Sequence, residues 1–239
     1  MGNMTVAPKT NLALVEGQLS NEAERIKALI STGGAPRISL DRAGRFQGPD
    51  GLDLGPEIRG TVVDFIFKNQ YYTSSYDPNN PVPPVCFAMA GIEEQPEMAP
   101  HESSPEPQAD NCAACPHNQW GSRGKGKACK NTYELAFVLE EDLGSDNPKL
   151  HQISVPPTGM KSFSAFANLC ARVLNAPPIK ALVTIRAVQQ GTYTTMAFAD
   201  PDNNEHYADL LPLREEARAL ISNAPDLSNY KPAPKAARR

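Results

Sequence analysis

Four of the five cysteines in this chain are spaced as ligands of a zinc ion. Only two residues separate Cys112 from Cys115, so two thiolates can converge on one ion while the backbone amides between them point at the sulfurs. Cys86 precedes this pair and Cys129 follows it, which makes four thiolates available for a tetrahedral site. Because the protein would supply every ligand, no position is left for water, and we expect the zinc to be structural rather than hydrolytic.

Other interpretations of the cysteines remain open at this point. The Cys-x-x-Cys pair could be a redox pair, with Cys86 or Cys129 a small buried apolar residue, although no alternation of strands and helices surrounds the pair. Alternatively, His117 or His101 could replace Cys86 in a site with three cysteines and one histidine. The fifth cysteine, Cys170, lies on the apolar stripe of an expected helix and is predicted to be a core residue.

A dense group of cations lies between the Cys-x-x-Cys pair and the start of the following strand. Cations suit phosphate, glycines allow close backbone approach, and Trp120, the only tryptophan, offers a face for stacking on a base. This combination predicts a nucleic-acid contact loop. The alternative is a solvated turn in which Trp120 covers the zinc site. The predicted phosphate-binding cations are Arg123, Lys125, Lys127 and Lys130.

The end of the strongest expected strand adds two further candidates. Lys68 could contact phosphate, and Tyr72 could stack on a base with only two ordered torsions. Tyr71 is a weaker candidate, because adjacent residues of a strand face opposite sides.

Residue patterning predicts a mainly β chain with a few helices. The clearest strand covers residues 58–73, where Val63, Phe65 and Phe67 are expected to share one face. Acidic residues and prolines between residues 92 and 111 predict an exposed loop. A strand pair is expected within 37–46, and single strands at 84–89, 134–140, 152–155, 181–188 and 192–198. Helices are expected at 21–31, 161–174 and 211–222.

Several motifs occur here in a recognisable order: Tyr71-Tyr72 at a strand end, Pro84-x-Cys86-Phe87, CxxCPxNxWGS over residues 112–122, and GKGKACK over residues 124–130. In this order they resemble the single-stranded-DNA-binding proteins of tailed bacteriophages. The resemblance covers roughly residues 36–200. It implies an OB-type β-barrel with an inserted zinc element, and a role in coating single strands during phage replication or recombination.

These observations together predict a mainly β chain of the α+β class, organised in three parts. Residues 1–35 are expected to form an N-terminal arm with a short helix. Residues 36–222 are expected to form an OB-like barrel with flanking helices and a zinc ribbon or knuckle loop inserted at about 86–130. Residues 223–239 are expected to be a basic, disordered tail.

The predicted function is that of an accessory protein that binds single-stranded DNA with little sequence preference. The alternative is a zinc-stabilised interaction module that contacts a polymerase or another replication or transcription partner through the acidic residues 92–111. We do not expect an enzyme, because the sequence has no P-loop, HExxH or GxSxG motif and no evident cluster of carboxylates.

Charge and hydropathy limit the possible partners and locations. The formal net charge is −4 and the isoelectric point is near 5.6, so any site for a polyanion must be local. No stretch approaches 18 uninterrupted apolar residues, and the start of the chain lacks an export signal. We therefore expect no membrane partner and a location in the cytoplasm, which is the host cytoplasm if a phage encodes the chain.

Overall fold

The computed structural model describes residues 36–49, 51–74 and 81–230. The chain divides into two units, Met1–Gly34 and Ala35–Arg239, and all described residues belong to the second. The helix predicted at 21–31 lies outside the described residues, as does the end of the predicted tail from residue 231 onward.

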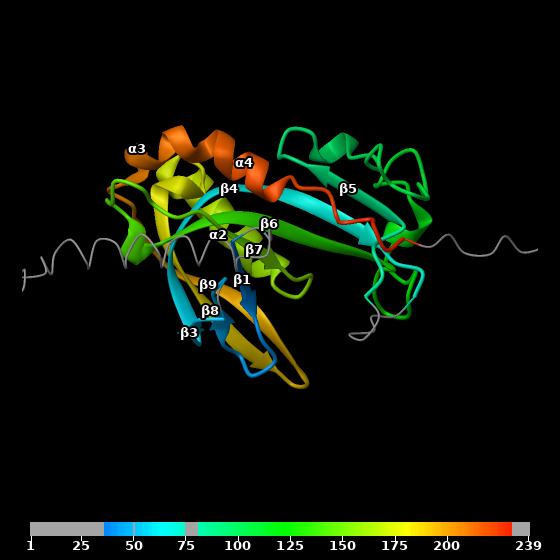
Figure 1. Cartoon of the computed structure of the whole chain (residues 1–239), viewed down its shortest axis with the longest axis horizontal. Coiled ribbons are helices and arrows are strands. Elements are labelled where there is room, and N and C mark those ends of the chain that lie inside the picture. The colour runs from blue at the N-terminus through cyan, green and yellow to red at the C-terminus, as the bar shows by residue number, and fades with distance from the viewer. Residues whose placement is uncertain (1–35, 50, 75–80, 231–239) are drawn as a thin grey trace, which may run out of the picture. The chain divides into compact units, whose positions relative to one another are not determined.

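The described strands form one curled half-barrel sheet (Figure 1). They are β1 (Arg37–Leu40), β2 (Phe46–Gln47), β3 (Asp53–Gly55), β4 (Glu57–Tyr71), β5 (Cys86–Ala90), β6 (Cys129–Leu139), β7 (His151–Val155), β8 (Ala181–Gln190) and β9 (Tyr193–Asn203). The order across the sheet is β3-β2-β1-β7-β6-β4-β8-β9, and β5 also pairs with β4. Only β1 and β7 pair in parallel; the other pairs are antiparallel.

Strand β4 organises the sheet, because one of its edges serves two different partners. Its first half pairs with β8 up to Thr61, and its last residues pair with β5 from Phe67 onward. Between these two positions that edge has no partner strand among the described residues. The opposite edge pairs with β6 from Gly60 to Tyr71. The gap between β8 and β5 therefore opens the sheet beside the middle of β4.

The predicted strands are confirmed, and β3 is an addition that the sequence did not predict. One expectation about β4 is wrong: Phe65 and Phe67 contact the core on one face of the sheet, but Val63 packs in the core of the other face. The cause is a β-bulge between Val62 and Asp64, which inserts an extra residue and reverses the alternation of side chains.

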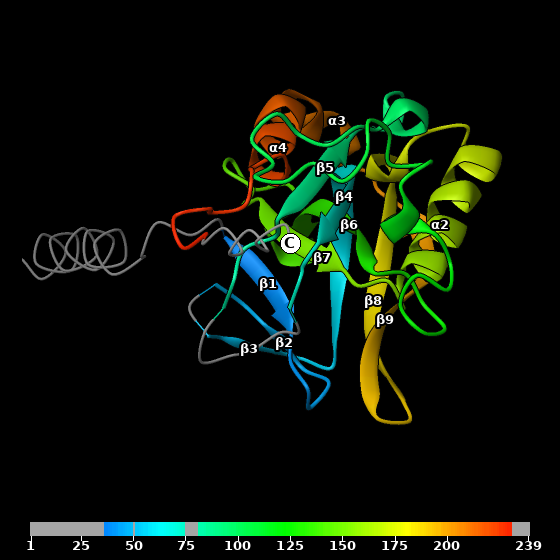
Figure 2. The ribbon, with the colours of Figure 1, turned by 90° about the vertical axis from the view of Figure 1, so that its right-hand side faces the viewer.

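Helices cover both faces of the sheet (Figure 2). On one face lies α2 (Met160–Leu169), continued by a π-helical turn at Cys170–Leu174, and on the other lie α3 (Tyr207–Leu210) and α4 (Arg214–Ile221). Both longer helices confirm their predictions. None of the described helices has the length and apolarity needed to span a membrane. Short 3₁₀ turns are Gln95–Glu97, Pro116–Asn118, Glu140–Asp142, Pro178–Lys180 and Leu211–Leu213.

An ion pair between buried Asp64 and half-buried Arg218 fixes α4 to the sheet. Asp64, just after the bulge, accepts hydrogen bonds from Arg218 Nε at 2.7 Å and Nη2 at 2.9 Å. The same carboxylate accepts the backbone N–H of Phe65 at 2.8 Å. Its charge is therefore compensated at the one part of β4 where a strand is missing on that edge.

His151 on β7 is a buried base, and its Nδ1 atom has no hydrogen-bond partner among the described residues. Burial lowers the pKa of the imidazole below its ordinary value of about 6.5, and Asp142 only partly opposes this. Between the folded and unfolded pKa values, the unfolded chain binds more protons. Stability contributed by neutral His151 is thus complete above the unfolded pKa and is lost as the pH falls through the folded value.

We therefore expect His151→Gln, which cannot titrate, to lose less stability than the wild type between about pH 7 and about pH 5. Thermal unfolding midpoints over this range measure the effect. His206→Gln, at an exposed histidine, is the control and should follow the wild type. Equal losses in His151→Gln and the wild type would contradict the prediction.

Candidate functional site

The four predicted ligand cysteines gather at one end of the sheet, where β5 and its flanking loops lie beside the ends of β4 and β6 (Figure 1). Cys86 begins β5 and Cys129 begins β6, and both pair with Tyr71 at the end of β4. Cys112 and Cys115 lie in the connection from β5 to β6. All four thiols are buried, are free of disulfides and line one cavity of about 10 Å³.

The electrostatics of this cavity disfavour thiolates unless a cation is present. Burial raises the pKa values of Cys86 and Cys112, and it raises the pKa of Cys129 to about 12. Neighbouring cysteines add to the rise at Cys129, and Lys127 only partly opposes it. A reactive thiol in a Cys-x-x-Cys pair instead needs a lowered pKa, and the shift at Cys112 is in the opposite direction.

The cysteine cluster fits zinc in its chemistry, since soft thiolates that surround a small cavity are typical zinc ligands. In the described part of the chain, however, no three side chains of His, Cys, Asp or Glu are arranged so as to hold a metal ion. The zinc site therefore stays a prediction. Neither alternative histidine lines the cavity: His117 stacks on Tyr71 with 4.1 Å between ring centroids, and His101 stacks on Phe87 at 5.0 Å.

A set of hydrogen bonds holds the loop that follows the Cys-x-x-Cys pair, and Asn118 is its centre. Asn118 Nδ2 donates to the carbonyl of Cys112 at 2.8 Å, and Oδ1 accepts from Lys127 Nζ at 3.2 Å. Oδ1 also accepts from Asn131 Nδ2 on β6 at 3.0 Å. Asn118, the asparagine of the CPxNxWGS segment, thus joins the loop to the sheet.

The same loop presents Trp120 to solvent. Its side chain is 78% exposed, and Lys127 Nζ lies 5.8 Å from the ring centroid. Trp120 does not line the cysteine cavity, and its exposure does not favour the alternative in which it covers the predicted zinc site. Arg123 and Lys125 are exposed in a tight turn closed by hydrogen bonds between Arg123 and Gly126, and Lys130 is exposed on β6. The structure therefore brings four predicted contacts together on one loop: Trp120, Arg123, Lys125 and Lys127.

Two predicted contacts do not belong to that surface. Lys68 and Asn69 are adjacent on β4, so their side chains face opposite sides of the sheet, and Asn69 is the one on the side of the loop. Lys68 is buried, and burial lowers its pKa, with Glu134 opposing the shift. Burial raises the pKa of the Tyr72 hydroxyl, and the charge of Glu134 adds to this rise. Both residues thus lie near Glu134 instead of the basic loop.

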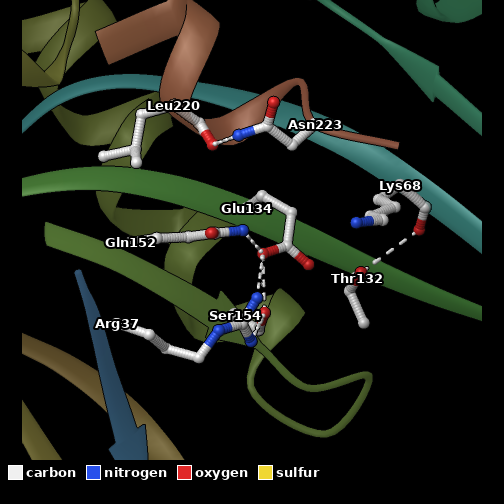
Figure 3. A network of polar contacts seen from close by, with 8 residues as sticks. All are labelled: Arg37, Lys68, Thr132, Glu134, Gln152, Ser154, Leu220 and Asn223. Atoms are coloured by element: carbon white, nitrogen blue, oxygen red, sulfur yellow. Dashed lines mark hydrogen bonds and ion pairs between the residues drawn. The ribbon is translucent and has the colours of Figure 1, made fainter. Parts of the chain in front are cut away.

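A polar network explains why Glu134 can be buried (Figure 3). Its carboxylate accepts hydrogen bonds from Gln152 Nε2 at 2.8 Å and from Ser154 Oγ at 2.6 Å. Arg37 lies 3.9 Å away and donates to Ser154 Oγ at 2.9 Å. The network joins β1, β7 and β6, and its residues satisfy one another, which is the arrangement of a structural contact.

A groove of about 490 Å³ lies on the face of the sheet that carries α2. It occupies the gap beside the unpaired edge of β4, and its floor is an aromatic cluster. Ring centroids in this cluster are 4.8 Å apart for Phe67 and Tyr133, and 4.9 Å apart for Phe65 and Phe163. The sequence alone does not predict this groove, because its floor and walls come from distant parts of the chain.

Known proteins add nothing to this geometry. Comparison with family models, with curated proteins and with solved structures finds no match to this chain. The resemblance to phage single-stranded-DNA-binding proteins is therefore a prediction that depends on the motifs themselves, above all the segment from Cys112 to Lys130.

Proposed function

We propose that this protein binds single-stranded nucleic acid, with DNA as the expected ligand, through the loop between Cys115 and Lys130. The observation that carries the proposal is Trp120, a large aromatic side chain held in solvent beside Lys127. An exposed aromatic face with adjacent cations provides both stacking on a base and contact with phosphate. The formal net charge of the chain is −4, so a polyanion would have to bind at a local group of cations such as this loop.

The position of the loop in the sheet supports the proposal. The five long or central strands of the half-barrel are, in chain order, β4, β6, β7, β8 and β9. If these are the strands of an OB-type barrel, the loop lies in the connection between the first and second of them. In OB folds that connection, together with the one between the fourth and fifth strands, binds oligonucleotides. The OB-type identity of the half-barrel is part of this proposal.

Zinc has the role of a scaffold in this proposal. Cys86, Cys112, Cys115 and Cys129 would hold it, and the bound ion would supply a fixed positive centre that compensates four buried thiolates. The chain itself positions the contact residues: Asn118 holds Lys127, and Ser122 Oγ accepts the backbone N–H of Ala128 at 2.9 Å. The loop would then present Trp120 to the nucleic acid, while the cysteines that hold the ion stay buried.

The double substitution Lys125→Glu with Lys127→Glu tests the proposal. We expect it to weaken binding to a fluorescent oligothymidylate at least tenfold, and to weaken binding to other sequences equally. The slope of log affinity against log salt should fall by about 1.4, since each lost phosphate contact to a single strand removes about 0.7. Fluorescence anisotropy at several salt concentrations measures both quantities.

The matched control reverses two exposed lysines elsewhere, Lys149→Glu with Lys161→Glu, and changes net charge by the same amount. Its salt slope should equal that of the wild type. Zinc content should be the same in all three proteins, and thermal stability should fall only slightly in the variant with Lys127→Glu, which loses the hydrogen bond from Lys127 to Asn118. A wild-type protein that binds no single strand at low salt would overturn the proposed function.

A second candidate function is a protein-interaction module that uses the acidic segment 92–111. The structure shows Glu93, Glu94, Glu97 and Glu102 exposed. The carboxylate of Glu94 also accepts the backbone N–H of Gly91 at 2.6 Å. This candidate is favoured if the Lys125 and Lys127 reversal leaves nucleic-acid binding unchanged.

A further inference from the structure

We propose that the groove beside β4 receives one unpaired base of the bound strand. This inference rests on the proposed function and deepens it, because it assigns a second contact that the loop residues do not provide. The groove has a volume of about 490 Å³, within the range of roughly 300–1,000 Å³ found for small-molecule sites. It lies between the aromatic floor on β4 and β6 and the wall formed by α2 and its π-helical turn.

The lining of the groove matches a nucleobase in its chemistry. Phe67 is half-buried and Tyr133 lies against it, so a flat ring can stack on the floor. Tyr133 Oη and Ser164 Oγ are 2.9 Å apart, and this hydrogen bond fixes the tyrosine. Asn168 and Asn175 also line the groove, and within the described residues neither amide makes a hydrogen bond. These amides can pair with the donors and acceptors on the edge of a base.

Charge excludes the phosphate itself from the groove. None of the described residues that line it is charged. A neutral, flat ligand with a hydrogen-bonding edge therefore fits the groove, and the phosphate attached to it must lie outside.

The groove lies a short distance along the sheet from Asn131, to which the basic loop is hydrogen-bonded through Asn118. Phe67 of β4 pairs with Tyr133 of β6. Asn69 pairs with Asn131, and this pair lies two residues nearer to the basic loop on both strands. Two residues of a strand span about 7 Å. Asn131 Nδ2 donates to Asn69 Oδ1 at 2.5 Å and to Asn118 Oδ1, which also accepts from Lys127. A strand whose phosphates contact the loop thus passes the mouth of the groove, and one of its bases can turn inward.

The test fills the groove with Ala171→Trp. Ala171 lines the groove and is exposed on the π-helical turn, so a larger side chain there should not disturb the core. The matched control is Ala165→Trp, an exposed alanine of α2 that does not line the groove. A second variant, Asn168→Leu, keeps the size of the side chain but removes its hydrogen-bonding groups.

In the first arm, full-length proteins are titrated with oligothymidylate and with an abasic strand of equal length. Ala171→Trp should bind oligothymidylate at least tenfold more weakly than wild type, with an unchanged salt slope. Ala165→Trp should match wild type, and Asn168→Leu should lie between the two. All four proteins should bind the abasic strand equally. Wild-type affinity of Ala171→Trp for oligothymidylate, while the Lys125 and Lys127 reversal abolishes binding, would overturn the groove inference and leave the proposed function intact.

In the second arm, free deoxyadenosine and thymidine are titrated and followed by saturation transfer from protein to ligand in NMR spectra. Transfer is expected with wild type and Ala165→Trp and should disappear with Ala171→Trp. Transfer to the nucleosides without any binding of single strands would support the groove and overturn the proposed function. Transfer to N-acetyl-phenylalanine amide but not to either nucleoside would overturn the inference in favour of a protein side chain.

Discussion

Replacing Cys115 with serine is expected to remove zinc from the protein and to lower its unfolding free energy by at least about 3 kcal/mol. Structural zinc contributes roughly 10–16 kcal/mol of apparent binding free energy in small zinc peptides, and binding is coupled to folding. Cys115 lies in the cavity that the other three predicted ligands also line. Loss of one thiolate of four should therefore release the ion and leave three buried thiols without it. Metal analysis and chemical denaturation measure the two effects.

Cys170→Ser provides a matched control, because Cys170 is also buried but packs in the core that contacts α2. It should lose some stability and keep its zinc. A strong chelator should lower the melting temperature of the wild type and of Cys170→Ser but leave Cys115→Ser unchanged. Wild-type protein that is purified with zinc in the medium and contains none would contradict the prediction, and so would full zinc content in Cys115→Ser.

The second large effect is expected at Gly60, where β4 pairs with Leu139 of β6. A Cβ atom on this residue would lie 2.1 Å from the carbonyl oxygen of Val138 and 2.8 Å from ring atoms of Phe137. A backbone carbonyl in the centre of a sheet cannot move aside without breaking the pairing of strands. Gly60→Ala is therefore expected to cost about 3 kcal/mol or more, or to prevent folding.

Gly48→Ala is the control for this substitution. Gly48 is also buried, but a Cβ atom there would meet its nearest neighbour, the carbonyl oxygen of Leu52, at an ordinary 3.5 Å. Denaturant unfolding followed by circular dichroism compares the two variants with the wild type. A change in Gly60→Ala within about 0.5 kcal/mol of zero, the range of a typical surface substitution, would show that the strands are not this close.

The local elements were largely predictable, because each is specified by neighbours in the sequence. The β-branched and aromatic run at residues 58–73 corresponds to β4, and the apolar stripe at residues 161–174 corresponds to α2 and its π-helical turn. Cys170 is in the core as its position on that stripe predicted. Strict alternation along the strand predicted the wrong face of the sheet for Val63. The β-bulge that changes its face adds one residue to the pairing with β6, and this pairing is not a local property of the sequence.

The predicted nucleic-acid contacts were likewise predictable only where they lie close together in the sequence. Trp120, Arg123, Lys125 and Lys127 are close together in the sequence, so a single loop had to keep them close in space. Lys68 was predicted as a phosphate contact on its position at a strand end, but its side chain lies on the other face, near Glu134. A strand residue in this sheet is accessible or buried according to what covers its face, and no local pattern contains that information.

By itself, the sequence determined the four cysteines that could hold zinc, the loop that carries the cations and Trp120, and most of the strands. Only the tertiary structure decided that the cysteines line one cavity, that Asn118 links the loop to β6, and that a gap beside β4 leaves an aromatic groove open. The physical reason is the range of the interactions. Propensity, turn chemistry and ligand spacing act over a few residues, whereas the groove depends on where β5, β8 and α2 end against β4.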